Sequence, residues 1–192
     1  MSVTITDQAP QVTVDESTYN LTISTATGVP GPTGATGAPG YHGAFYSTVT
    51  QTNPSVSATN VMTFNATSSA SGVTLANSSK ITVTCAGFYN VAFSAQLDKT
   101  DSGDDDIEIF LVVNGNQVAY SNTKVTLSGN NAKSIAAWNW IVQLSAADYV
   151  EIGWYSADLG MRLHAETAGT SPTRPAIPSV IATINQIQNP PS

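Results

Sequence analysis

Glycine recurs at every third position across residues 28–45. The six glycines are Gly28, Gly31, Gly34, Gly37, Gly40 and Gly43. Because glycine makes up about 7% of residues in average proteins, five further glycines in register after the first arise by chance about once in a million. Only glycine fits where three polyproline-like chains meet at a common axis, so the period predicts a collagen-like triple helix. A flexible glycine-rich linker is the alternative interpretation.

A triple helix in this segment has consequences for assembly. At roughly 3 Å rise per residue, residues 28–45 form a stalk on the order of 50 Å long. The last two triplets contain Tyr41, His42 and Phe45, so the rod can end near Gly40. So few triplets do not hold three chains together unaided, and a flanking part of the chain must keep them in register. The sequence therefore predicts a homotrimer.

Residues 1–27 precede the predicted stalk and form a candidate N-terminal arm. Apolar residues alternate in three short threonine-rich segments, which predicts three β-strands. The apolar pairs are Val3 and Ile5, Val12 and Val14, and Leu21 and Ile23. The arm is too short to bury a core by itself. We expect it to anchor the chain to other copies or to a larger assembly, with a frayed tail as the alternative.

Residues 46–192 follow the stalk and are predicted to form an all-β head. Alternating apolar runs are separated by turn residues such as Asn114-Gly115, which favours a tight hairpin. The runs are Ile81–Cys85, Tyr89–Leu97, Ile107–Val113, Gln117–Leu127, Ile135–Leu144, Tyr149–Tyr155 and Val180–Ile187. Many short strands without a helical period predict a β-sandwich or jelly roll. Ile107–Val113 is apolar on both faces, which predicts a subunit interface there.

Two motifs in the head resemble the complement C1q/tumour-necrosis-factor-like superfamily and its bacterial and phage relatives. Gly87–Phe93 matches the pattern G-x-Y-x-(V/F)-x-F. Leu144–Val150 resembles L-x-x-G-D-x-V, with Ala147 at the usual glycine position. Pro175–Ile181 resembles the final strand of C1q-like domains in phage virion proteins, and the arm resembles those of phage fibre and appendage proteins. With the stalk, the resemblance covers residues 28–188.

The resemblance implies a jelly-roll head with threefold symmetry. It places Tyr89, Val91 and Phe93 on the inner sheet near the trimer axis. Their alternation independently puts these three side chains on one strand face, in the core or at an interface. Trp138 and Trp140 share the face of another strand, where a core or trimer-interface role competes with an aromatic platform for sugars.

The charge composition excludes several classes of function. Only 10% of the residues are charged, and the formal net charge is −7. A nucleic-acid-binding protein needs a basic surface, and so does a protein that adsorbs to anionic membranes. No apolar run approaches the roughly 20 residues that cross a bilayer. The first residues contain no basic stretch followed by an apolar segment, so we expect no signal peptide.

The residues that usually carry catalysis are sparse. Cys85 is the single cysteine, which excludes an intrachain disulfide and favours a small buried side chain. His42 and His164 lack the spacing of a nucleophile–base pair. Outside one acidic segment the carboxylates are scattered, without the pairing that glycan hydrolysis requires. We therefore expect a protein that is not an enzyme.

The acidic segment between Asp98 and Glu108 is a candidate calcium site. Its oxygen-rich side chains Asp101, Asp104, Asp105 and Asp106 are ligands of the kind that Ca²⁺ prefers, although their order does not match an EF-hand. A solvated hairpin whose charges keep the head soluble is the favoured alternative. We expect no cofactor other than this candidate ion.

Together these features predict a structural component of a phage virion. We expect a short trimeric fibre or appendage, anchored to a capsid or tail protein through residues 1–27, whose head attaches to a host-surface glycan or protein. A capsid decoration protein or head fibre without a specific receptor is the first alternative. A collagen-like adhesin of a bacterial or spore surface is the second.

Overall fold

The computed structural model describes residues 2–5, 11–15, 20–24 and 40–189. The chain divides into two compact units, Met1–Thr36 and Gly37–Ser192. All regular secondary structure in the described ranges is β, and no helix there is long and apolar enough to span a membrane. Most of the predicted stalk, including Gly28, Gly31, Gly34 and Gly37, lies outside the described residues.

The first unit contains a three-stranded antiparallel sheet with the order β1-β2-β3. The strands are β1 (Ser2–Ile5), β2 (Gln11–Asp15) and β3 (Asn20–Ser24), which coincide with the three segments of alternating residues. The register sets apolar positions opposite one another: Val3, Val14 and Leu21 in one row, and Ile5, Val12 and Ile23 in another.

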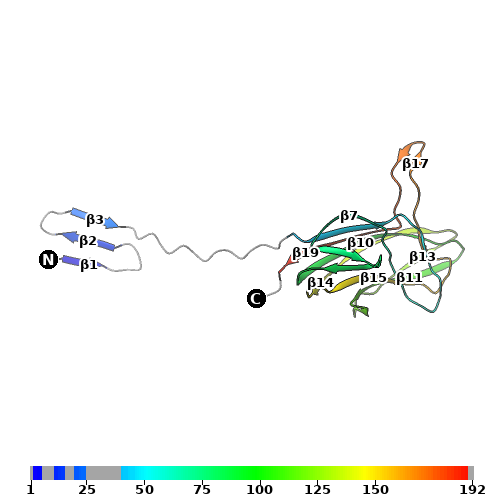
Figure 1. The fold of residues 1–192 in the computed structure, drawn as a ribbon, viewed down its shortest axis with the longest axis horizontal. Helices are drawn as coiled ribbons and strands as arrows, with labels where there is room; N and C mark the ends of the chain where they lie inside the picture. The colour runs from blue at the N-terminus through cyan, green and yellow to red at the C-terminus, as the bar shows by residue number, and fades with distance from the viewer. Residues whose placement is uncertain (1, 6–10, 16–19, 25–39, 190–192) are drawn as a thin grey trace. The chain divides into compact units, whose positions relative to one another are not determined.

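The second unit, called the head, contains two seven-stranded sheets (Figure 1). Sheet I has the order β5-β16-β10-β19-β4-β7, with β14 paired to β10. Its strands are β4 (His42–Ser47), β5 (Gln51–Thr52), β7 (Ala66–Ser71), β10 (Gly87–Asp98), β14 (Lys133–Leu144), β16 (Arg162–Leu163) and β19 (Val180–Gln188).

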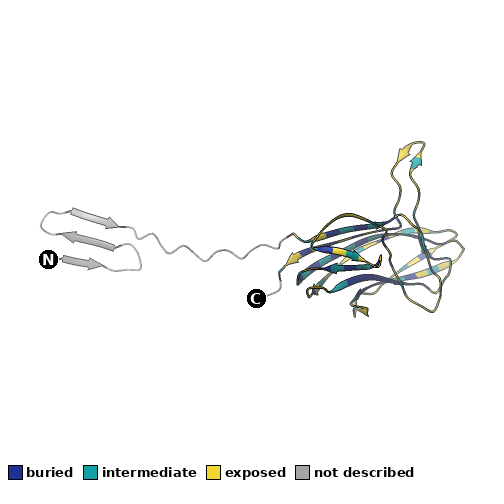
Figure 2. Ribbon diagram, viewed as in Figure 1, coloured by how far each residue is buried: buried dark blue, intermediate teal, exposed yellow. Residues whose placement is uncertain are grey.

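Sheet II has the order β12-β11-β15-β9-β8, with β13 paired to β11 and β6 paired to β15. Its strands are β6 (Asn60–Val61), β8 (Val73–Ala76), β9 (Lys80–Val83), β11 (Asp104–Val113), β12 (Asn116–Gln117), β13 (Thr123–Ser128) and β15 (Tyr149–Tyr155). A separate hairpin, β17 (Gly169–Thr170) with β18 (Thr173–Arg174), projects from the body (Figure 1). It is largely exposed (Figure 2).

The core lies between the two sheets. Residues along β10 alternate between buried and half-buried (Figure 2). The buried apolar ones form one core cluster with residues of sheet II. The largest fully buried apolar side chains are Trp154, Tyr89, Phe45, Phe64, Met62, Ile81, Leu97, Ile107, Ile109, Leu111 and Leu144. This clustering explains why period-two alternation predicts strands such as β10 and β19, in which the residues of one face are buried and those of the other are half-buried or exposed.

The head begins earlier in the chain than the predicted boundary at residue 46. Strand β4 starts at His42 and pairs with both β19 and β7, so Gly43 lies in a sheet and not in a triple helix. A Cβ atom at Gly43 would lie 2.6 Å from the Phe45 ring. Gly43 is therefore explained by close packing in the core. Gly40 has a φ of 75°, a left-handed conformation outside the polyproline region.

Both faces of β11 are buried within a single chain, which corrects the interface predicted from its sequence. Ile107, Ile109 and Leu111 face the core. On the opposite face Phe110 is only 7% exposed and lies over Gly153, where a Cβ atom would come within 2.3 Å of its ring. The doubly apolar pattern of β11 thus needs no second copy to bury it.

The pairing of the long strands defines two ends of the head. At one end, called the near end, β4 begins and β19 ends, because His42 pairs with Asn185. The opposite end, called the far end, contains the pair Asp98–Lys133, which closes the β10–β14 ladder. The β17–β18 hairpin projects on the far side of the body from the C-terminal end of β19 (Figure 1).

Candidate functional site

Four strands of sheet I form a nearly uncharged surface. In β4, β10, β14 and β19 the only Asp, Glu, Lys or Arg residues are Asp98 and Lys133, which lie opposite each other at the far end. The outward face of these four strands, which we call the neutral face, therefore carries such charged residues only at its far end. Charged side chains are the usual means by which proteins keep an exposed sheet face in water.

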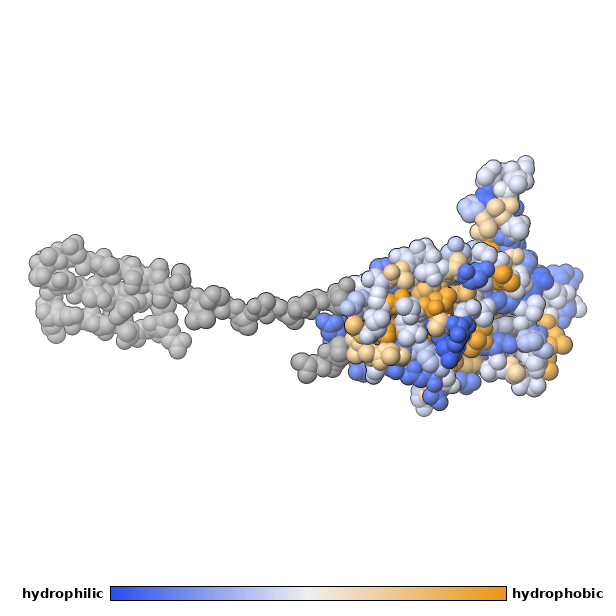
Figure 3. All heavy atoms as spheres, viewed as in Figure 1, coloured by the Kyte–Doolittle hydropathy of each residue, from blue (hydrophilic) through white to orange (hydrophobic). Residues whose placement is uncertain are grey.

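Large apolar side chains are exposed on the neutral face. Ile135 and Ile141 on β14 are 62% and 66% exposed, and Ile181 and Ile187 on β19 are 43% and 45% exposed. Apolar side chains reach the surface in the middle of the head (orange in Figure 3). Several such residues on one face are characteristic of a surface that contacts another protein.

Neutral amide side chains fill the centre of the neutral face. The amide nitrogen of Asn139 donates to Oδ1 of Asn90 at 2.6 Å, and the amide nitrogen of Asn90 donates to Oδ1 of Asn185 at 3.2 Å. This chain of hydrogen bonds crosses β14, β10 and β19. It satisfies polar groups without charge, so the face can be covered at a low desolvation cost.

A hollow of about 350 Å³ lies at the β4 side of the neutral face. We call it the β4 groove; its lining is mostly apolar. The lining residues are Ala44, Phe45, Tyr46, Thr48, Ser68, Ala176, Pro178 and Ile181. They come from β4, β7, β19 and the segment that leads into β19, so residues distant in the sequence build one groove.

Tyr89, Val91 and Phe93 lie in the core of a single copy. They are 0%, 0% and 5% exposed and belong to the face of β10 that packs against sheet II. The Tyr89 hydroxyl donates to the backbone oxygen of Cys85 at 2.8 Å, and burial raises the pKa of Tyr89. These three residues are therefore core residues of a single copy.

Trp138 and Trp140 pack against Phe93 at the side of the sandwich. The ring centroids lie 4.8 Å and 5.3 Å from that of Phe93, and the Trp140 ring stacks on it at 13°. The Trp140 ring nitrogen donates to the backbone oxygen of Ser121 at 3.1 Å. Because Phe93 covers one face of the Trp140 ring, this arrangement does not resemble an open platform for a sugar.

The four predicted calcium ligands do not come together. Asp101 and Asp105 both approach the ammonium of Lys99, whose side chain is fully buried. Burial alone would lower the pKa of Lys99, but the hydrogen bond and charge of Asp105, together with Asp101, raise it. Asp158, which the sequence did not single out, completes a carboxylate group with Asp101 and Asp105. The Lys99 ammonium supplies the positive charge at this group of carboxylates.

The other two predicted ligands, Asp104 and Asp106, belong to β11 and do not join that group. Oδ1 of Asp106 accepts a hydrogen bond from the Thr126 hydroxyl at 2.6 Å, and its other oxygen pairs with Lys124 at 3.1 Å. These two contacts lower the pKa of Asp106, with the Thr126 hydrogen bond contributing most. Asp106 is thus part of a surface contact between β11 and β13.

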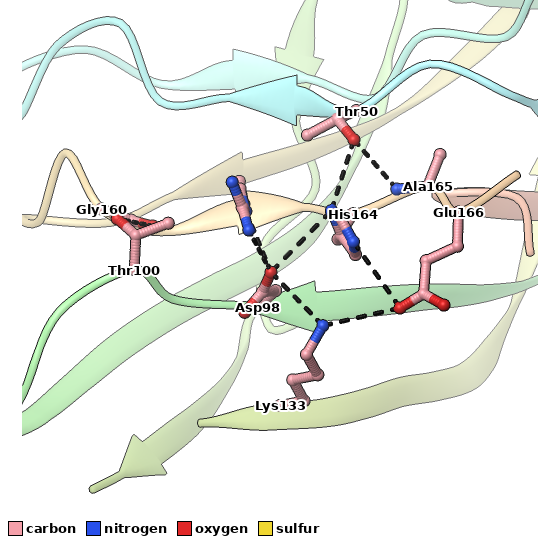
Figure 4. A network of polar contacts seen from close by, with 9 residues as sticks. Thr50, Asp98, Thr100, Lys133, Gly160, His164, Ala165 and Glu166 are labelled. Atoms are coloured by element: carbon pink, nitrogen blue, oxygen red, sulfur yellow. Dashed lines mark hydrogen bonds and ion pairs between the residues drawn. The ribbon is translucent and has the colours of Figure 1, made fainter. Parts of the chain in front are cut away.

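A polar network at the far end gathers residues that are distant in the sequence (Figure 4). Oδ2 of the buried Asp98 accepts hydrogen bonds from Nε and Nη2 of Arg162 at 3.0 and 2.6 Å. Lys133 lies 3.7 Å from Asp98 and 3.6 Å from Glu166. His164 stands between the same two carboxylates, at 3.8 and 3.6 Å. Only strand pairing brings the members of this network together, so no local sequence pattern predicts it.

The far-end network borders a hollow of about 260 Å³, but its geometry does not support catalysis. The Thr50 hydroxyl lies 3.5 Å from Nδ1 of His164, beyond the range of about 2.6–3.2 Å for a nucleophile and its base. That hydroxyl oxygen accepts a hydrogen bond from the backbone nitrogen of Ala165. The charges compensate one another, so the network fixes β10, β14 and β16 to the segment that follows β16.

Comparisons with known proteins show a similarity in structure but none in sequence. No protein-family model matches the chain, and no curated protein matches its sequence. Among solved structures, the chain is similar to the globular domain of the zebrafish complement 1qA protein. That similarity has a TM-score of 0.47 and 13% sequence identity, and it covers 79% of this chain and 99% of that chain.

Proposed function

We propose that this chain is a homotrimeric structural protein of a phage virion: a short stalked appendage that displays a C1q-like head for attachment to a host surface. The observation that carries the proposal is the neutral face, a broad outer surface of sheet I that is charged only at its far end and has four exposed isoleucines. An isolated copy would expose this surface to water. Covering it with other copies of the chain removes apolar area from solvent, at about 25 cal/mol for each Å².

The glycine period gives a reason for the number of copies. A collagen-like helix needs three chains, so the three heads begin close to one axis. Strand β4 starts at His42, two residues after Gly40, and belongs to the neutral face. The first strand after the proposed stalk therefore begins at the uncharged end of this face. Contact between the heads supplies the register that so few triplets lack.

The far end is suited to contact with another surface. It lies opposite the start of β4 and bears the network of Asp98, Lys133 and Arg162 together with the exposed β17–β18 hairpin. Three copies would present three such ends side by side. Weak binding at each would add to a stronger attachment when the sites engage together.

The first experiment places the protein on the particle. An antibody against the head should label intact virions, with detergent-disrupted particles as the reference for total antigen. Absence of label on intact virions, with antigen present after disruption, would refute a surface appendage. Label confined to the capsid would favour a decoration protein or head fibre over a tail appendage.

The second experiment tests attachment. Purified full-length chain, added before the phage, should reduce adsorption to host cells in a concentration-dependent way. The matched control is Arg174→Ala, at an exposed residue of the β17–β18 hairpin, which alters the far end and leaves the neutral face intact. Equal adsorption with and without the wild-type chain would remove the attachment role and leave the decoration role.

A further inference from the structure

Each contact in a threefold ring joins two different surfaces of neighbouring copies. If the chain is the proposed homotrimer, two different surfaces of the head must therefore meet. Sheet I runs in the order β14-β10-β19-β4-β7 across the neutral face. The β4 groove lies at one side of this order, and β14 lies at the other. In the described part of the chain, β14 pairs with β10 and with no other strand.

Tyr120 projects beside β14 without covering by its own chain. Its side chain is fully exposed, and its backbone has a φ of 63°. This left-handed conformation is uncommon for a bulky residue. The aromatic ring of Tyr120 is exposed to solvent in a single copy and is accessible to a second copy.

The turn around Tyr120 is held firmly in place. The Ser121 hydroxyl donates to the Val118 backbone oxygen at 2.7 Å, and the Leu111 backbone nitrogen donates to the Ser121 hydroxyl oxygen at 3.0 Å. The ring nitrogen of Trp140 donates to the Ser121 backbone oxygen at 3.1 Å. These contacts come from sheet II and from β14. The position of Tyr120 is therefore preorganised, which lowers the cost of binding.

The geometry points to a head-to-tail contact in which Tyr120 of one copy packs into the β4 groove of the next. The groove has a volume of about 350 Å³, at the lower end of ligand-sized pockets and sufficient for a phenol ring. Its apolar lining suits the ring, and the hydroxyls of Thr48 and Ser68 suit the phenol oxygen. Neither the groove nor the surroundings of Tyr120 include a charged side chain.

The placement of the two features permits closure of a ring. A projecting residue at one edge of a sheet and a groove at the other allow each copy to hold the next by the same contact. Repeating the contact after a third of a turn returns to the first copy. A contact of Tyr120 with Tyr120 would instead join only two copies.

Disulfide trapping tests the contact in the full-length chain. In a Cys85→Ala background, Tyr120→Cys is combined with Ser68→Cys, an exposed position in the groove. Mild oxidation should give covalent species that end at three chains on a denaturing gel without reductant. The matched control combines Tyr120→Cys with Thr74→Cys, an exposed position on β8 of sheet II, and should remain uncrosslinked.

The mass in solution is measured on the same samples before oxidation. If the mass is that of three chains, three results would overturn the Tyr120 contact: no crosslinks, crosslinks that stop at two chains, or equal crosslinking of the control pair. Each of these results would leave the proposed homotrimer unaffected. A single-chain mass refutes the homotrimer itself. As a second variant, Tyr120→Asp should raise the concentration for half-dissociation at least tenfold, whereas Leu159→Asp, at another exposed apolar residue, should not.

Discussion

At the scale of single residues, Gly43 shows how one residue type can serve two structures. It is in phase with the glycine period, yet it pairs with Ile184 in sheet I and leaves room for the Phe45 ring. The periodic pattern alone therefore cannot show where a triple helix ends. Gly43 must be small because of packing in the head, and it happens to stand in phase with the glycine period. The periodic pattern therefore continues into the head.

The first prediction separates these two roles of glycine. Gly43→Ala should destabilise the head by about 1–3 kcal/mol, because the new methyl group overlaps the Phe45 ring. Gly34→Ala is the matched control and should leave the unfolding of the head unchanged. Thermal unfolding followed by near-ultraviolet circular dichroism measures both. Equal effects on the head transition would contradict this account of Gly43.

The second prediction concerns Tyr89 and alkaline pH. Tyr89→Phe should cost about 1 kcal/mol at neutral pH, because the hydrogen bond to Cys85 is lost. Burial, followed by repulsion from Cys85 and Tyr41, raises the pKa of Tyr89 above its ordinary value of 10.0. The folded state therefore keeps a proton that the unfolded chain releases, and this stability is present below pH 10 and lost as the pH rises through the folded pKa.

The wild-type chain should thus lose stability above about pH 10 more steeply than Tyr89→Phe does. Denaturant unfolding at a series of pH values gives the difference between the two proteins. The difference should shrink as the pH increases. A difference that is constant across this range would show that Tyr89 does not titrate with unfolding.

At the scale of elements, the long strands were predictable and their partners were not. The sequence run Tyr149–Tyr155 coincides with β15, because the core residues Val150, Ile152 and Trp154 stand at alternate positions. The run Gln117–Leu127, predicted as one strand, is divided into β12 and β13 by the turn at Tyr120. Strand β4 was not predicted, because its first residues overlap the end of the glycine period. The far-end network depends on register between distant strands, which leaves no local pattern.

The third prediction tests the network that closes the β10–β14 ladder. Asp98→Asn should destabilise the head by about 2 kcal/mol, because Arg162 loses its charge-assisted hydrogen bonds to a buried carboxylate. Asp104→Asn is the control, since Asp104 is an exposed residue at the start of β11. Urea unfolding at neutral pH compares the two. If Asp98→Asn and the control had the same free energy of unfolding, the network would not contribute to the stability of the head.

The fourth prediction concerns calcium and the loop between β10 and β11. The Lys99 ammonium already lies against Asp101 and Asp105, so millimolar Ca²⁺ should leave the melting temperature unchanged relative to a chelator. Lys99→Met should lower the melting temperature in the absence of calcium, because the carboxylates then repel one another. A rise in the wild-type melting temperature with Ca²⁺ would restore the calcium site.

At the scale of the whole molecule, the sparse charge has a spatial order. The long strands of sheet I are charged only where Asp98 meets Lys133, and the acidic segment continues from that point into the loop after β10. The near end and the middle of the neutral face are uncharged, as the proposed contact between copies requires. In this account the low charge content of the sequence follows from assembly, and the exposed charges mark the end that faces away from the start of β4.

The central claim is that three copies meet through the neutral face, and the native mass of the full-length chain tests it most directly. Light scattering should give three times the chain mass of 19.9 kDa for the wild type. Ile141→Lys, which introduces a charge on the neutral face, should shift the mass toward one chain, while Thr74→Lys on β8 should remain trimeric. A single-chain mass for the wild type, or a trimer that Ile141→Lys leaves intact, would contradict the account.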